Sequence, residues 1–143
     1  QPARRFFPVA RATGTGLLAR VPHASGLLDG SYRPGMTFPP GDHRAHRKRE
    51  WLERSLRRVE RISFIHGEGT GRTIAQAAIQ FCLSEPSVAS VLPNITSEGE
   101  LREFAAAPDT PPLTEEEVAR LHDLFDHDFY LDTPEVPTLG GGR

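Results

Sequence analysis

Two short apolar runs divide the chain, and each of them ends at a proline. Residues 17–21 read Leu-Leu-Ala-Arg-Val before Pro22, and residues 88–92 read Val-Ala-Ser-Val-Leu before Pro93. Runs of this length are typical of buried strands, and proline ends them because it has no amide hydrogen to give to a ladder. Helical sequence separates the two runs, so the pattern predicts neighbouring strands of an alternating α/β sheet.

The other segments with periodic apolar positions have helical spacing. Helices are predicted in residues 3–13, in residues 43–61, and after Thr73, Ser97 and Thr114. Ser97 with Glu100, and Thr114 with Glu117, have the spacing of capping boxes, in which each residue bonds an amide of the other. These two boxes predict where the last two helices begin.

The loop after the first apolar run is rich in small residues. Ala24, Ser25 and Gly26 are followed by Asp29 and Gly30. Small side chains let backbone amides come close to a bound molecule, and ligands of α/β sheets bind outside the carboxyl ends of the strands. The alternative is an ordinary turn by which the strand leaves the core.

Three motifs resemble the aldo/keto reductase family. Residues 20–32 are similar to that family's seventh-strand sequence, usually Pro-Leu-Ala-x-Gly-x-Leu-x-Gly-Lys-Tyr, and residues 73–93 are similar to its seventh helix and eighth strand. The similarity continues through residues 113–121 and covers most of residues 3–126. The resemblance implies an α/β protein of the (β/α)8 TIM barrel type, an oxidoreductase that uses NADP or NAD to reduce an aldehyde or ketone.

The length of the chain fits only part of such a barrel. It has 143 residues and begins at Gln1 without an initiator methionine. A (β/α)8 barrel typically needs about 250 residues. We therefore expect residues 1–126 to be the C-terminal half of the barrel, with parallel strands 7 and 8, and residues 127–143 to be a tail. The missing N-terminal half would be its partner. The alternative is an independent half-barrel that acts as an interaction module or complements a separate N-terminal half.

The resemblance also implies which residues hold the cofactor. The first loop would cradle the pyrophosphate with backbone amides freed by small residues, and the second loop and its helix would face the adenosine end, where a helix N-terminus suits an anion. The first group is Val21, Pro22, His23, Ser25, Gly26 and Leu28, and the second is Pro93, Asn94, Ile95, Thr96, Glu100, Glu103 and Phe104. His23 either has a structural role or reaches the phosphates.

The chain departs from the family pattern near the adenosine end. Glu100 stands where many members have Arg or Gln, and it would repel the 2′-phosphate of NADP. Arg102 is the only cation near this loop in the sequence. We therefore expect weak discrimination for the 2′-phosphate, or a preference for NAD.

A second departure lies at the nicotinamide end. Arg20 stands where some members place a tyrosine that stacks on the nicotinamide, so this stacking contact is not expected here.

No catalytic residue is assigned to this chain. The catalytic Asp, Tyr, Lys and His of the family belong to the first half of the barrel, and the resemblance matches none of them here. The single lysine, Lys48, lies in the basic helix, and Tyr32 and Tyr130 have no lysine or histidine at motif spacing. The chain alone is therefore expected not to reduce a carbonyl compound.

The basic segment, residues 43–61, allows two interpretations. It holds eight Lys or Arg residues and three Glu residues, and its apolar residues share one helix face. A basic helix could bind a nucleic-acid backbone, but the favoured interpretation is a surface helix with ion pairs at spacings of three or four, so no nucleic-acid partner is expected. His43 and His46 could share a helix face, but no further ligands at metal spacing accompany them.

Composition excludes other classes of protein. The formal net charge is −2, and no apolar run reaches the roughly 18 residues of a membrane helix, so no membrane partner is expected. No signal peptide is visible, and the single cysteine, Cys82, cannot form an internal disulfide. Cys82 lies on an apolar helix face, as expected of a core residue rather than a nucleophile. A cytoplasmic location fits these features.

Overall fold

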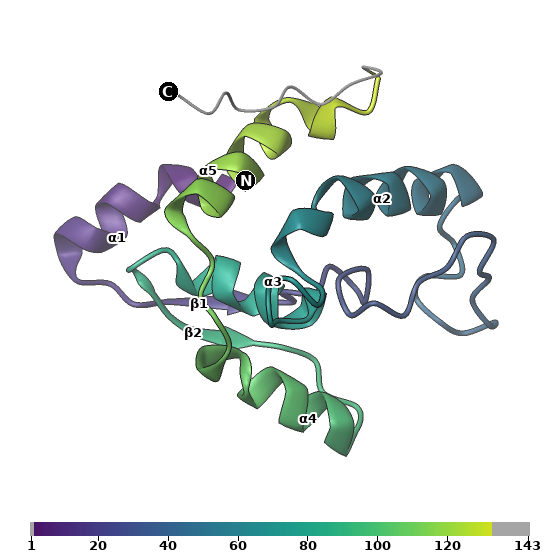
Figure 1. Ribbon diagram of the computed structural model, residues 1–143, viewed down its shortest axis with the longest axis horizontal. Helices are drawn as coiled ribbons and strands as arrows, with labels where there is room; N and C mark the ends of the chain where they lie inside the picture. Colours follow the sequence, from purple (N-terminus) through teal and green to yellow (C-terminus); the bar gives the residue numbers. More distant parts are fainter. Residues whose placement is uncertain (1, 133–143) are drawn as a thin grey trace.

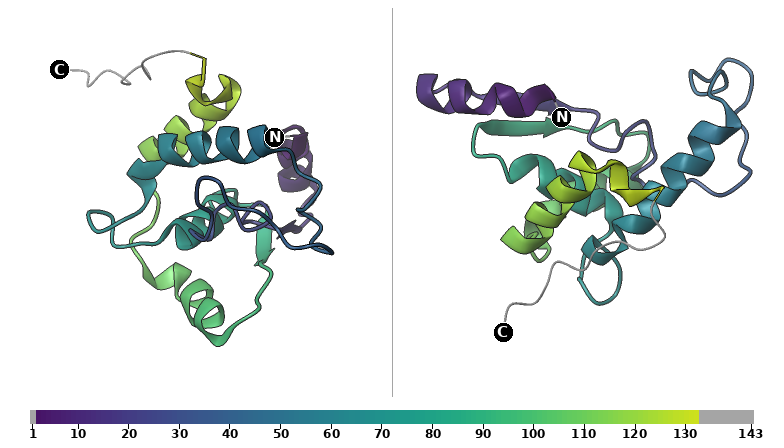
Figure 2. Two further views of the ribbon diagram at one scale, coloured as in Figure 1. Left: turned by 90° about the vertical axis from the view of Figure 1, so that its right-hand side faces the viewer. Right: turned by 90° about the horizontal axis from the view of Figure 1, so that it is seen from above.

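The structure, a computed structural model, describes residues 2–132 as short helices around a small parallel sheet (Figure 1). In chain order the elements are η1 (Pro2–Arg5), α1 (Phe7–Thr13), β1 (Leu17–Arg20), α2 (Arg49–Arg61), η2 (Ser63–Ile65), α3 (Ile74–Leu83), β2 (Val88–Leu92), α4 (Glu98–Ala105), η3 (Ala107–Asp109), α5 (Glu115–Asp126) and η4 (Asp128–Tyr130). Figures 1 and 2 place α1 and α2 at opposite ends of the molecule, with α3 and the sheet between them.

The two strands pair in parallel, as the apolar runs predict. Leu18 lies opposite Ser90 and Arg20 lies opposite Leu92, with an irregularity in the register between Leu17 and Leu18. The first strand is one residue shorter than predicted, because Val21 has a left-handed backbone (φ 54°) that turns the chain out of the ladder. The carboxyl ends of the two strands therefore lie side by side.

Capping boxes begin the three helices of the C-terminal half, at the positions that the sequence predicts. The side chain of Ser97 accepts from the amide of Glu100, and that of Thr114 accepts from the amide of Glu117. Thr73 forms a third box with Gln76 at the start of α3. Because each box satisfies amides that would lack partners, the helix starts are fixed locally.

α3 is the centre of the core. Its face with Ile74 and Ala77 packs with Leu121 and Leu124 of α5. Its face with Ala75 and Ile79 packs with Phe104 of α4 and Ala107 of η3. Ala75, Ala77, Ala107 and Leu124 have no exposed surface. Small alanines on α3 thus let helices approach it from two sides.

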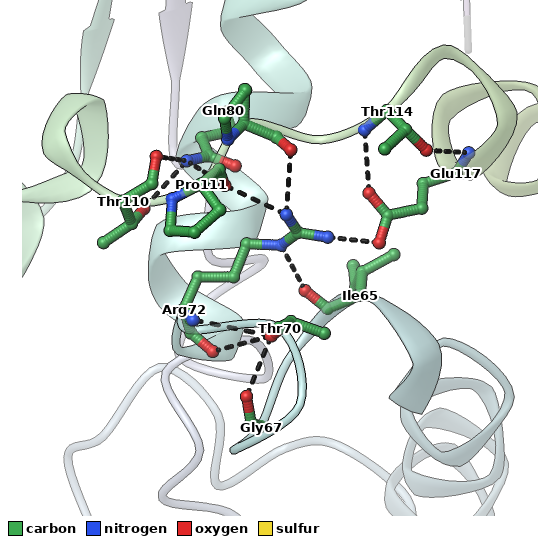
Figure 3. A network of polar contacts seen from close by, with 10 residues as sticks. Ile65, Gly67, Thr70, Arg72, Gln80, Thr110, Pro111, Thr114 and Glu117 are labelled. Carbon is green, nitrogen blue, oxygen red and sulfur yellow. Dashed lines mark hydrogen bonds and ion pairs between the residues drawn. The ribbon is translucent and has the colours of Figure 1, made fainter.

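Arg72 joins three parts of the chain just before α3 (Figure 3). Its side chain is only 4% exposed. Its Nε donates to the carbonyl of Ile65 at 2.7 Å, and its Nη1 donates to the carbonyls of Pro111 and Pro112, each at 2.9 Å. Its Nη2 forms an ion pair with Glu117 at the start of α5. The guanidinium therefore fastens η2 and α5 to the start of α3.

The basic helix is α2, and it begins later than the basic segment. Lys48 is its N-cap, so His43 and His46 lie in the turns before it and do not share a helix face. Of the predicted ion pairs within the helix, Glu53 pairs with Arg49 at 2.7 Å. Other arginines of this helix form contacts with residues 128–131 instead.

The segment after α5 packs on α2. Asp128 forms ion pairs with Arg54 and Arg58, Arg57 donates to the carbonyl of Leu131, and Leu131 is buried. The predicted tail, residues 127–143, therefore begins with a packed segment. Its remainder, residues 133–143, lies outside the described residues.

Replacing Asp128 with Asn tests this contact. Hydrogen bonds from Arg58 and then Arg54 lower the pKa of Asp128, so its stabilising effect is complete above the ordinary value of 3.8 and is lost as pH falls through the lowered pKa. We expect Asp128→Asn to lower the Tm by about 1–3 °C at pH 7, because the pair is exposed, and by less at pH 3. Equal melting temperatures at pH 7 would contradict this account.

The sheet in residues 2–132 has two strands. β1 and β2 therefore each have one edge that pairs with no other strand of the described residues. Leu18 of β1 is 62% exposed and Leu92 of β2 is 47% exposed. Unpaired strand edges and exposed leucines fit a partial barrel. Within the described part of the chain, no helix has the length and apolarity needed to cross a membrane.

Candidate functional site

A pocket of about 720 Å³ opens where the two strands end. Predicted site residues from both loops line it, and so do four residues that were not among the predicted cofactor-binding residues. The predicted ones are Val21, Pro22, His23, Ser25, Gly26, Asn94, Thr96, Glu100, Glu103 and Phe104, and the others are Asp29, Ser31, His43 and Arg44. The pairing of β1 with β2 brings the two loops together.

Left-handed backbone shapes the loop after β1. Val21, Ala24 and Ser25 have φ of 54°, 50° and 61°, which non-glycine residues rarely adopt. Gly26 follows with φ +90°, and a Cβ at this position would lie 2.9 Å from Oδ2 of Asp29. Such strain persists only where surrounding contacts hold it, and it is typical of ligand sites.

The amides of this loop are less free than the small residues suggest. The amides of Ala24, Gly26 and Leu28 donate to carbonyls within the loop. Those of His23 and Ser25 have no acceptor among residues 2–132. The prediction of a loop with freed amides therefore holds for two positions, because the tight turns occupy most of the others.

The His23 ring is part of the packing beneath the pocket. His23 is buried, and its Nε2 lies 3.2 Å from the carbonyl oxygen of Ala75 in α3. Its ring centroid lies 4.4 Å from that of Phe104 in α4. Of the two roles left open by the sequence, the structural one has direct contacts: His23 ties the first loop to α3 and α4.

The Glu100 carboxylate accepts hydrogen bonds from the residues at the start of α4. Its Oε2 accepts from the amide and hydroxyl of Thr96 at 2.6 and 2.8 Å and from the amide of Ser97 at 3.1 Å. These bonds, those from Thr96 first, lower the pKa of Glu100, so the group is ionised at neutral pH. The anion expected at this helix N-terminus is thus partly supplied by the protein itself.

Arg44 is the arginine of this site that the sequence did not predict. It lines the pocket from the loop before α2, and a bidentate ion pair holds it to Asp42, with Nη2 to Oδ2 at 2.6 Å and Nε to Oδ1 at 2.9 Å. Arg102, the cation that the sequence suggested, pairs with Glu98 at 2.5 Å and does not line the pocket. Arg44 is therefore the arginine that faces this site.

Three predicted residues lie outside the pocket lining. Leu28 packs against the core cluster of α3 and α5. Pro93 and Ile95 belong to the loop after β2, where Ile95 is 45% exposed. Cys82 is also away from the site, and burial raises the pKa of its thiol, as expected for a packing residue.

Comparison with known proteins shows which family this chain resembles. The family model described as "Aldo/keto reductase family" matches residues 1–126. Two relatives named "Probable voltage-gated potassium channel subunit beta" are each 34% identical: one from Arabidopsis thaliana over 113 residues, or 76% of this chain, and one from Oryza sativa subsp. japonica over 118 residues, or 79%.

Solved structures agree with the sequence matches. The aldo-keto reductase AKR11C1 from Bacillus halodurans matches in its apo and holo forms, each with a TM-score of 0.62, 26% identity and 85% of this chain covered. The chain spans 38% of that structure and 34% and 36% of the two relatives' length. The fold is accordingly part of a (β/α)8 barrel, and the chain belongs to the aldo/keto reductase family.

Proposed function

We propose that the pocket at the ends of β1 and β2 is part of a nicotinamide dinucleotide site, and that the two strands are strands 7 and 8 of the barrel. The observation that carries this proposal is the convergence of the two predicted loops on one pocket outside the carboxyl ends of parallel strands. In barrels of this type, ligands bind at that face. Membership of the aldo/keto reductase family supports the choice of ligand class.

The loop after β1 fits a phosphate-bearing ligand through its backbone. The amides of His23 and Ser25, which have no acceptor in the described part of the chain, can donate to phosphate oxygens. Gly26 has no room for a side chain, because the side chains of Asp29, Arg44 and Tyr32 lie within 3.4 Å of the position that its Cβ would take, and this close packing sets the shape of the loop. A bound dinucleotide would supply the hydride, and these residues would hold it in place.

The whole protein is proposed to be an oxidoreductase that reduces an aldehyde or ketone. Proton donors would come from another part of the barrel, since the resemblance places the catalytic Asp, Tyr, Lys and His there. The present chain would supply part of the cofactor site and would be inactive alone. The carboxylate of Glu100 beside the pocket favours NAD over NADP as the cofactor.

Direct titration tests the proposed site. The natural polypeptide is titrated with NADH and with NADPH, and binding is followed by nicotinamide fluorescence and by calorimetry. We expect saturable binding of NADH and weaker binding of NADPH. No binding of either dinucleotide would contradict the proposed site, and clearly tighter binding of NADPH would contradict the preference alone.

Gly26→Ala should weaken dinucleotide binding by at least about tenfold. The added methyl group would require a strained backbone and would meet the Asp29 carboxylate at 2.9 Å and Nη1 of Arg44 at 3.3 Å. Gly35→Ala is the matched control, because Gly35 also has a positive φ (+75°) but nothing lies within 4 Å of its added Cβ. Equal NADH affinities in the two variants would show that the close packing around Gly26 does not matter for dinucleotide binding.

A second candidate function is assembly with another polypeptide. The chain would then be an independent half-barrel, an interaction module or the complement of a separate N-terminal half. Two observations favour it: the open edges of β1 and β2, and relatives whose names describe channel subunits. Light scattering after size exclusion tests the idea, because a monomer with the mass of one complete barrel would contradict it.

A further inference from the structure

We propose that Arg44 is a positioning residue for the dinucleotide, holding the loop after β1 in the shape that receives the pyrophosphate. This inference rests on the proposed function and assigns a role to the loop before α2, residues 31–48. Arg44 contacts both Tyr32 and Ser25.

Arg44 and Tyr32 hold the same backbone carbonyl. The hydroxyl of Tyr32 donates to the carbonyl oxygen of Ser25 at 2.6 Å, and Nη1 of Arg44 lies 3.2 Å from that hydroxyl oxygen and 3.5 Å from the carbonyl oxygen. Tyr32 is 4% exposed. The carbonyl is therefore fixed by a buried phenol and a cation.

The carbonyl that they hold lies at the most strained part of the loop. Ser25 has a left-handed backbone, and the flanking residues Ala24 and Gly26 also have positive φ. The amide of Ser25 is one of the two in this loop without an acceptor among residues 2–132. Holding the Ser25 carbonyl therefore restrains the backbone conformation of Ser25, and with it the amide that we propose for the phosphate site.

Asp42 holds Arg44 in turn. The Asp42 carboxylate accepts from the backbone amide of Arg44 at 2.8 Å and from Nε and Nη2 of its side chain. Hydrogen bonds from Arg44 lower the pKa of Asp42, and the same carboxylate raises the pKa of Arg44. The guanidinium also lies 4.6 Å from the centroid of the Phe38 ring. Arg44 is thus a preorganised group, with its charge already paired.

This pairing makes Arg44 a support for the loop. Asp29, Glu100 and Glu103 also line the pocket, so a pyrophosphate that enters it must be held by correctly directed amides. Loss of the guanidinium would free the loop to leave its strained shape. The cost would then appear in binding of ligands that carry the pyrophosphate.

The test compares Arg44→Met with Arg44→Lys and Tyr32→Phe in the natural polypeptide. The probes are NADH, ADP-ribose and adenosine, titrated by calorimetry, and the Tm of each variant is measured. Arg102→Met is the matched control, because Arg102 is a neighbouring arginine paired with Glu98 outside the pocket.

We expect Arg44→Met to weaken NADH and ADP-ribose binding by about tenfold, and Tyr32→Phe by about threefold, with adenosine binding unchanged. Arg44→Lys should restore part of the loss, since an ammonium can reach the same oxygens without the fork. Equal losses for adenosine and ADP-ribose, or NADH binding by Arg44→Met as tight as by Arg102→Met, would overturn the role of Arg44. If the unmodified protein binds adenosine but neither NADH nor ADP-ribose, the proposed function fails as well.

Discussion

Replacing Arg72 with Met should lower the free energy of unfolding by about 3–5 kcal/mol, because removing one partner of a buried ion pair leaves the other partner uncompensated. The Arg72 side chain is 4% exposed and that of Glu117 is 18% exposed. The carbonyls of Ile65 and Pro112 would also lose their donor, and the carbonyl of Pro111 would keep only the hydrogen bond from Gln80. Urea unfolding of the two proteins, followed by circular dichroism, measures the difference.

Two further variants separate the guanidinium from its charge. Arg72→Lys keeps the cation but cannot donate to all four partners, so we expect a smaller loss than for Arg72→Met. Arg49→Met is the matched control, because Arg49 is 82% exposed and forms a pair of the kind worth about 0.3–0.5 kcal/mol. A loss for Arg72→Met that is no larger than the loss for Arg49→Met would contradict the role given to this network.

The contrast between these arginines shows what the sequence could predict. Capping boxes at Ser97 and Thr114 were predictable, because both partners lie within four residues and the bonds are local. The parallel strands were predictable from two proline-ended apolar runs. The Arg72 network was not, because its acceptors lie up to 45 residues away and most of them are backbone carbonyls, which have no sequence signature.

The candidate site was predictable to a similar degree. The family resemblance located the loops, and the pairing of the strands brought them to one pocket. Arg44 was missed because the loop before α2 has no periodicity to relate it to Ser25, 19 residues earlier. The available signal was the Asp-x-Arg spacing of Asp42 and Arg44, since an aspartate often accepts from the amide two residues later.

The number of free amides in the loop after β1 was overestimated from the sequence, for a related reason. Small residues permit left-handed turns, but the same turns create bonds such as those from Gly26 to His23 and from Leu28 to His23. Composition indicates that a loop can approach a ligand. It does not show which amides the loop has already used.

Glu100→Gln should raise the affinity for NADPH by about three- to tenfold and leave the affinity for NADH within about twofold, because it removes one negative charge beside the proposed 2′-phosphate position. The lowered pKa of Glu100 keeps this charge present throughout the neutral range. The amide oxygen of Gln can still accept from Thr96 and Ser97, so the start of α4 should be preserved. Titrations with both dinucleotides at low and high salt measure the change.

Glu98→Gln is the control for this substitution. Glu98 lies in the same first turn of α4, is exposed, and pairs with Arg102 outside the pocket lining. The same loss of charge there should alter NADPH binding much less, and salt should reduce the effect of Glu100→Gln because exposed charges are screened. If the two variants gained NADPH affinity equally, the general potential of the helix end, and not the position of Glu100, would set the cofactor preference.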